Sequence, residues 1–458
     1  MIDILIVFLY LLILPIISIH KKRTGNNFSS FSKITEKLKG NKLILVATIF
    51  ASSIGGGTTF GISEKAFSEN IAYGYGLIMA IPVDIAIAIY IIPRLIKHYG
   101  AESIGDIMYT YYGNAGRYIS GFSSILVSVG LLAAQISVSG RIFEYILGID
   151  YILGVVLSYG IVVIYTTIGG FQSILFTNLL QFFTIIVAIP IISLFGLYEI
   201  GLENFIDKVP PDKISFTANS ELLGASVSAM LGFIMINLLP TFIQRVLINR
   251  QVQTTQTAIY IKSLIYFLFI IFVTLNGLIA FIQFPEVKAN IALPYLIGSI
   301  IPHGIQGIVV VGLLAAVMST ADSDLNVLSI TTVKDFFKPI FAIKEESKML
   351  LIVRITNIIL GSFAIILALS FNKIVDLVIF ISGFWGAITL LPLIFGLYNI
   401  VIGKYAFIVT SISGALSFII WSRFFETNTS LKGVFVGAMV NLVIFFIFYI
   451  KKSFYKTL

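Results

Sequence analysis

The chain has 458 residues, of which 58% are hydrophobic and only 11% are charged, and its mean hydropathy is +1.01. Soluble domains carry about 25% charged residues, and the apolar runs here recur from one end of the sequence to the other. The composition therefore excludes a soluble domain and predicts an all-α polytopic membrane protein that spans a lipid bilayer. The formal charge of +8 resides in basic residues dispersed at segment ends, which favours topology signals over nucleic-acid binding. No cysteine is present, so thiol chemistry is excluded, and the three histidines are far apart in the sequence, which disfavours a histidine metal site.

A membrane helix needs roughly 20 apolar residues, and this criterion predicts about thirteen spans. Because the number is odd, the two termini lie on opposite sides of the membrane. Basic residues follow the first span ("HKKR", 20–23) and the last ("KKSFYK", 451–456), so the N-terminus is predicted outside and the C-terminus in the cytoplasm, across a bacterial cytoplasmic membrane. The predicted spans are 2–19, 43–63, 72–95, 118–147, 150–167, 172–198, 222–247, 256–284, 304–328, 350–371, 374–398, 405–422 and 433–450.

Two of these spans are interrupted. The segment "FASSIGGGTTFG" (50–61) holds three consecutive glycines, each of which costs a helix about 1 kcal/mol relative to alanine. The segment "MLGFIMINLLPTFIQR" (230–245) contains Pro240, which removes a backbone donor. Small residues can instead serve close helix packing, and a lone proline can simply kink a helix. Interruptions at corresponding places in two five-span halves nevertheless favour an inverted-repeat transporter with a site at mid-membrane.

This interpretation makes 1–458 a single transporter domain. We expect an extra N-terminal helix at 2–19, a first repeat at 43–198, a second repeat at 222–398 and two C-terminal helices within 405–450.

A third segment, "VGLLAAVMSTADSDLN" (311–326), places hydroxyl, carboxyl and amide groups in a row inside an apolar helix. Each buried polar group is unfavourable unless it has a partner. Oxygen-rich side chains facing an unwound backbone would suit a hard cation such as sodium. The alternative is that the hydroxyls bond back to their own helix.

Other intramembrane polar residues are candidates for gating or charge relay: Asp84, Asp322 and Gln244. A carboxylate such as Asp84, well inside a span, is a functional candidate by default, or it is paired structurally with Lys262 or Arg354. Asp322 and Asp324 follow the hydroxyl pair and could attract a departing cation. The alternative for both is a solvated helix end, which is favoured for Asp324.

Four segments together resemble the sodium:solute symporter family: "ASSIGGGTTFGISEKAF" (51–67), "YTTIGGFQSILFTNLLQ" (165–181), "IQRVL" (243–247) and "GLLAAVMSTADSDLNVLS" (312–329). That family includes proline, pantothenate, sugar and sialic-acid carriers and adopts the LeuT fold. The resemblance implies a secondary active transporter rather than an enzyme, working as a monomer. It would couple inward sodium flow to uptake of a small organic solute (amino acid, carboxylate or sugar-like) by alternating access. The alternatives are a transporter-like sensor domain acting with a partner chain, and a carrier whose sodium coupling is altered or lost.

Carried over by resemblance, the sodium site falls on the backbone carbonyls of Ala51, Ile54 and Ala316 and on the hydroxyls of Ser319 and Thr320. The same resemblance assigns the solute to Gly56, Gly57, Thr58, Gln135, Asn237, Phe384 and Trp385. Many members have aspartate where this chain has Ser53 and Asn178. Members with a second sodium use the aspartate at the Asn178 position, so we expect one co-transported sodium ion here.

Overall fold

The computed structural model describes residues 2–457, except for residues 24, 26, 36, 37, 39, 215–219, 236, 370–379, 382 and 427–430. The described part is a bundle of helices and contains no strand. Its first half consists of α1 (Ile2–Lys21), α2 (Phe28–Ser32), α3 (Lys42–Ala51), η2 (Gly57–Gly61), α4 (Ile62–Ser68), α5 (Ala72–Ala86), η3 (Ile87–Ile91), α6 (Ile92–Leu95), η4 (Ile96–His98), α7 (Ile104–Leu147) and α8 (Tyr151–Ile200).

The second half begins after two short helices, α9 (Leu202–Lys208) and α10 (Pro211–Ile214). It contains α11 (Ser220–Met235), α12 (Pro240–Val246), α13 (Val252–Gln283), η5 (Ala289–Ile291), α14 (Ala292–Ile300), α15 (Ile305–Thr331), η6 (Thr332–Phe337), α16 (Lys338–Ile340), α17 (Glu346–Ala368), η7 (Gly386–Leu390) and α19 (Leu391–Leu397). The chain ends with α20 (Lys404–Phe424) and α21 (Gly433–Thr457), which pack against each other.

The predicted fold class, an all-α polytopic membrane protein, is confirmed. Among the described residues, nine helices are long and apolar enough to cross a membrane, and four apolar helices are shorter: Lys42–Ala51, Leu222–Ile234, Ala289–Ile300 and Gly383–Leu397. The count of thirteen separate spans is not confirmed. Part of the predicted span 374–398 lies outside the described residues.

Two glycine kinks inside the long helices α7 and α8 lie next to predicted span boundaries. Within α8 two helical segments meet at Gly170, whose φ of 64° is not helical, and this kink falls between the predicted spans 150–167 and 172–198. A Cβ at Gly170 would lie 2.7 Å from the carbonyl oxygen of Phe31, so both the backbone conformation and the close approach require glycine. In α7 a similar kink at Gly113, with a φ of 61°, separates a first segment from the span predicted at 118–147.

The central helix of the bundle is α15. It packs against α7, α8, α1 and α17, and 89% of its most apolar window is buried inside the protein, compared with 33% for α1. Every residue of α15 from Val309 to Thr331 is buried. The segment that carries the polar run is therefore enclosed by protein rather than lipid.

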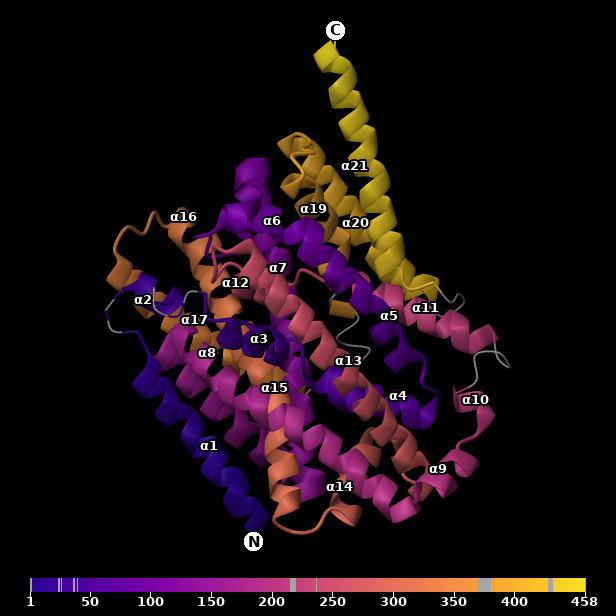
Figure 1. The fold of residues 1–458 in the computed structure, drawn as a ribbon. Helices are drawn as coiled ribbons and strands as arrows, with labels where there is room; N and C mark the ends of the chain where they lie inside the picture. Colours follow the sequence, from indigo (N-terminus) through magenta and orange to yellow (C-terminus); the bar gives the residue numbers. More distant parts are fainter. Residues whose placement is uncertain are drawn as a thin grey trace.

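The two ends of the chain lie at opposite ends of the bundle (Figure 1). The N-terminus lies toward the same end as α9 and α14, whereas α6, α19 and the C-terminus lie toward the other. This arrangement agrees with an odd number of membrane crossings between the two termini.

Candidate functional site

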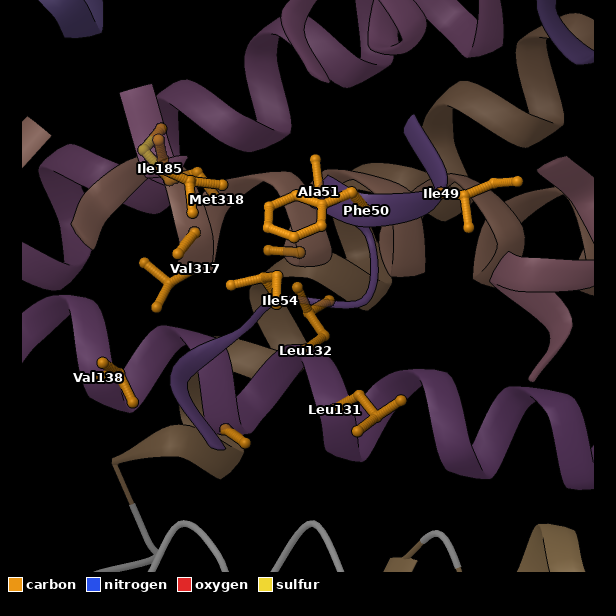
Figure 2. Packing of buried hydrophobic residues seen from close by; sticks show 14 of the residues in the cluster. Ile49, Phe50, Ala51, Ile54, Leu131, Leu132, Val138, Ile185, Val317 and Met318 are labelled. Carbon is orange, nitrogen blue, oxygen red and sulfur yellow. The ribbon is translucent and has the colours of Figure 1, made fainter. Parts of the chain in front are cut away.

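The predicted span 43–63 is broken after Ala51. Helix α3 ends there, and helical structure resumes only at Gly57, as a π-helix. Figure 2 shows the connecting segment, with Ile54 on it, passing between α15 and α7. A Cβ on Gly56 would lie 2.3 Å from Cγ2 of Val138 on α7. The glycine run thus lets an unwound backbone approach α7 closely, as the sequence predicted.

Five oxygen atoms converge at this break. The Ser319 hydroxyl donates to the carbonyl of Ala51 at 2.9 Å, and the Thr320 hydroxyl donates to the carbonyl of Ile54 at 2.7 Å. Both hydroxyls also lie within hydrogen-bond range of the Ala316 carbonyl, at 3.1 and 3.4 Å. All five residues are buried. These are the five positions that the resemblance assigned to sodium, and the structure brings them together.

The alternative of back-bonding alone does not describe these hydroxyls. Their bonds to Ala316 lie within α15, but the shortest contact of each hydroxyl crosses to another segment: that of Ser319 to the end of α3, and that of Thr320 to Ile54 in the break. A cation seated between the five oxygens would replace hydroxyl protons as the partner of the carbonyls. Three carbonyls and two hydroxyls are hard, neutral ligands, which fit a monovalent hard cation.

The five converging oxygens of Ala51, Ile54, Ala316, Ser319 and Thr320 form an oxygen cage. A second polar cluster lies next to this cage, around Asp322. Its Oδ2 accepts hydrogen bonds from the Tyr165 hydroxyl at 2.7 Å and from the Thr177 hydroxyl at 3.4 Å, both on α8. Its Oδ1 accepts from Ser323 at 3.1 Å. Tyr165 and Thr177 lie in the segment 165–181 that carries the family resemblance, but no role was predicted for either residue.

Helix α12 contributes a buried cation to this cluster. The Arg245 side chain is fully buried and donates to the Ser323 hydroxyl at 2.6 Å and to Gln244 Oε1 at 2.7 Å. Gln244 in turn donates to Asn326 at 3.3 Å. These contacts tie α12, the continuation of the second interrupted segment, to α15. A buried charge of this kind is stable only with such partners.

The expectation that Asp324 lies at a solvated helix end is wrong. Its side chain is 1% exposed, and Oδ2 has no hydrogen-bond partner among the described residues. The reason is that α15 continues as a buried helix beyond the polar run, so the carboxyl group faces the protein interior and the cavity described below.

Asn178 occupies the position where many family members have aspartate. Its amide nitrogen donates to Thr48 at 3.1 Å and to Ser323 at 3.5 Å. Its Oδ1 is buried and has no hydrogen-bond partner in the described structure. The other departure, Ser53, donates to the carbonyl of Ile49 at 2.6 Å. Neither residue supplies a negative charge at the break.

A cavity of about 200 Å³ lies beside the break. Four of the predicted solute residues line it, namely Gly57, Thr58, Gln135 and Asn237. Thr320 also lines it. One of the residues that contribute the five converging oxygens is therefore also part of the cavity wall.

The other predicted solute residues lie behind the wall. Gly56 packs against α7, and its N–H donates to Gln135 Oε1 at 2.6 Å. Trp385 is fully buried and donates to the backbone oxygen of Asn237 at 3.2 Å. Phe384 stacks edge-on against Phe418, with ring centroids 5.0 Å apart. Phe384 and Trp385 therefore do not line the cavity: Phe384 packs on α20, and Trp385 bonds to a residue of the cavity wall.

An ion pair completes the cavity wall. Lys262 on α13 donates to Oδ2 of Asp84 on α5 at 2.7 Å, and both residues line the cavity. Of the two partners considered for Asp84, the structure thus selects Lys262. The carboxylate lies just before the π-helix η3, a type of distortion that is frequent at functional sites.

The geometry defines a membrane transporter site, with an interrupted helix, an oxygen cage and an adjoining solute-sized cavity. Comparison with known proteins agrees: residues 41–414 match the model of the sodium:solute symporter family, and the chain belongs to that family.

Several curated relatives are similar along most of the chain. A sodium/pantothenate symporter of Haemophilus influenzae is 25% identical over 445 residues, covering 92% of this chain and 90% of the relative. The high-affinity proline transporter PutP of Bacillus subtilis is 25% identical, covering 88% of each chain. The mouse sodium/glucose cotransporter 1 is 23% identical, covering 70% of this chain and 55% of the relative.

Among solved structures, a substrate-bound, outward-open Na⁺-coupled sialic acid symporter superimposes with a TM-score of 0.85 at 16% identity, over 98% of both chains. The structure of MhsT in complex with L-phenylalanine gives a TM-score of 0.57 at 14% identity, over 91% of this chain and 99% of that one. These similarities establish the LeuT-like fold. Membership of the family makes this chain a sodium-coupled solute transporter of the membrane.

Proposed function

We propose that this protein carries one small organic solute together with one sodium ion into the cell. The ion binds to Ala51, Ile54, Ala316, Ser319 and Thr320, and the solute occupies the adjoining cavity. The observation that carries the proposal is the convergence of three backbone carbonyls and two hydroxyls, with contacts of 2.7–3.4 Å, at a broken helix.

Coupling follows from the wall that the two sites share. Thr320 lies in the cage and also lines the cavity. A sodium ion would hold the Thr320 hydroxyl and the broken end of α3 in place, and would thereby fix the cavity wall against which the solute packs. By linkage, the solute then raises the affinity for sodium by the same factor.

The limit of one sodium is supported by Asn178 and Ser53. A neutral amide and a back-bonded hydroxyl stand where many members carry aspartate, so no carboxylate from these positions balances a second cation. The orientation we propose places the N-terminus outside and the C-terminus in the cytoplasm of a bacterial cell, with the single chain as the working unit.

Uptake into proteoliposomes tests the proposal. The curated relatives supply the first probes, which are pantothenate, proline and glucose; a panel of amino acids extends them. We expect accumulation of one solute when an inward sodium gradient is imposed, and collapse of that accumulation when sodium is equal on both sides. Accumulation that ignores the sodium gradient would refute sodium coupling.

A further inference from the structure

The cavity contains an ion pair with unused bonding capacity. Within the described part of the chain, the Lys262 ammonium makes one hydrogen bond, to Asp84, and lies 4.6 Å from the Tyr266 ring centroid. An ammonium group has three donors, and a carboxylate has two acceptor oxygens. Both side chains line the cavity, although they are only 8% and 19% exposed. The pair therefore presents donors and an acceptor to whatever occupies the cavity.

The broken helix offers few free donors to an anionic group. The Gly55 N–H donates to the Thr58 hydroxyl at 2.8 Å, and the Gly56 N–H donates to Gln135 at 2.6 Å. The Thr58 N–H donates to the Gly55 carbonyl at 3.1 Å. Since these backbone groups are already bonded, Lys262 is the cationic partner that the described lining offers to a carboxylate.

The formal charges of the lining disfavour a net anion. Asp84, Lys262 and Asp324 are the charged residues among the described lining, two acidic and one basic. In a region of low dielectric, like charges repel strongly. A solute with one positive and one negative group can instead set its carboxylate against Lys262 and its ammonium against Asp84.

The remaining lining suits an apolar body. Its apolar members are Ile62, Leu77, Ala80, Ile81, Leu131, Phe233, Leu238, Leu239 and Phe242. Several polar side chains of the lining already have partners: Ser53 donates to Ile49, and Thr320 donates to Ile54. A polyhydroxylated solute would leave hydroxyls unpaired against this wall, and unpaired polar groups are strongly unfavourable when buried. A cavity of about 200 Å³ is also smaller than the roughly 300–1,000 Å³ of drug-sized sites.

From these four observations we infer that the solute is a small apolar α-amino acid, bound as a zwitterion by Lys262 and Asp84. The inference rests on the proposed function, because it names the solute that sodium-coupled uptake would carry. The ion pair is its charged subsite, and the apolar wall between α5, α11 and α12 receives its side chain.

Ligand binding to the purified protein in sodium tests the solute class. The probes are L-alanine, L-proline, L-leucine and L-phenylalanine, with D-glucose and pantothenate for comparison, and the readout is the thermal unfolding temperature. We expect at least one amino acid to stabilise the protein, with neither glucose nor pantothenate doing so. The N-acetyl derivative and the amide of that amino acid each lack one charge. Each should bind roughly tenfold to a hundredfold more weakly, as expected for the loss of one charged hydrogen bond.

Variants of the pair then test the subsite. In Asp84→Asn the loss of the carboxylate should shift preference toward the N-acetyl derivative, which is an anion. In Lys262→Met the loss of the ammonium should shift preference toward the amide, which is a cation. Because one buried charge without its partner is destabilising, the double variant Asp84→Asn/Lys262→Met serves as a folded reference that should bind none of the three well. Lys348→Met, which breaks an exposed ion pair with Glu345, is the matched control and should bind like the wild type.

Stabilisation by sodium alone distinguishes a failure of the solute assignment from a failure of the proposed function. If sodium stabilises the wild type but no amino acid in the panel does, or if the variants keep the wild-type order of preference, the assignment of solute class is overturned while the proposed function stands. If sodium has no effect and drives no uptake, the proposed function itself fails.

Discussion

At the scale of single residues, the cage depends on two hydroxyl groups that reach from one helix to another. Ser319 and Thr320 contact the carbonyls of Ala51 and Ile54 at 2.7–2.9 Å, whereas the Ser329 hydroxyl donates within α15, to the carbonyl of Asn326 at 3.1 Å. The polar run therefore contains both a cross-helix pair and an ordinary back-bonded serine. This contrast provides a built-in control.

We expect Ser319→Ala or Thr320→Ala to weaken sodium activation of uptake. Each change removes one of five oxygens from a cation, and a hydrogen bond to a charged group is worth about 1.5–3 kcal/mol, or roughly a tenfold to hundredfold change in affinity. Uptake against sodium concentration measures the effect, and high sodium should restore the apparent affinity for solute. Ser329→Ala should leave the curve unchanged. Normal sodium activation in the double alanine variant would remove the site assignment.

Asn178 permits the reverse experiment. Its buried Oδ1 has no partner among the described residues, and its amide lies 3.5 Å from the Ser323 hydroxyl. Asn178→Asp would add a negative charge beside Ser323 and Asp322. We expect a steeper dependence of uptake on sodium, measured as a Hill slope, together with lower thermal stability in the absence of sodium. An unchanged slope would mean that the neighbouring oxygens do not form a second cation site.

At the scale of elements, the break between α3 and η2 has two kinds of glycine. A Cβ on Gly56 would meet Val138 at 2.3 Å, whereas a Cβ on Gly57 would meet nothing within 4 Å and would face the cavity. Gly56→Ala should therefore displace the break from α7, lower stability by about 1–3 kcal/mol and weaken sodium activation. Gly57→Ala should keep sodium-dependent stabilisation and reduce affinity for the larger solutes. Thermal unfolding with and without sodium distinguishes the two, and equal behaviour would contradict this account of the break.

Elements also show what the sequence could and could not predict. The glycine run and the hydroxyl pair are local signals, so the break and the cage were predictable from the residues and the family resemblance. The partner of Asp84 was not predictable from the sequence, because Lys262 lies 178 positions away and Arg354 was an equal candidate. That Phe384 packs on Phe418 and Trp385 bonds to Asn237, rather than lining the cavity themselves, depends on contacts between segments far apart in the sequence. The kink at Gly170 within α8 falls between the predicted spans 150–167 and 172–198, so this boundary was predictable from the sequence.

At the scale of the whole molecule, the two chain ends lie at opposite ends of the bundle (Figure 1). Reporter fusions should place residues 20–42 and the C-terminus in the cytoplasm and residues 199–221 outside. The reason is that basic residues are concentrated on the predicted cytoplasmic side. Fusions at α9 and α21 are the sharpest pair, since these helices lie toward opposite ends of the structure. Cytoplasmic signals from both would contradict the proposed orientation.

The burial of α15 on all sides affects how this protein should tolerate amino-acid substitutions. Every residue from Val309 to Thr331 is buried, whereas only a third of the most apolar window of α1 is buried. A helix with one lipid-facing stripe should accept apolar replacements there, so a survey of every substitution along α1 should show tolerance rising and falling every three to four residues. Along α15 this periodicity should be absent. Substitutions at its Ala, Val and Leu positions should be as damaging as substitutions of its serines and aspartates. The functional segment would then stand out in such a survey by its uniformity rather than by isolated sensitive positions.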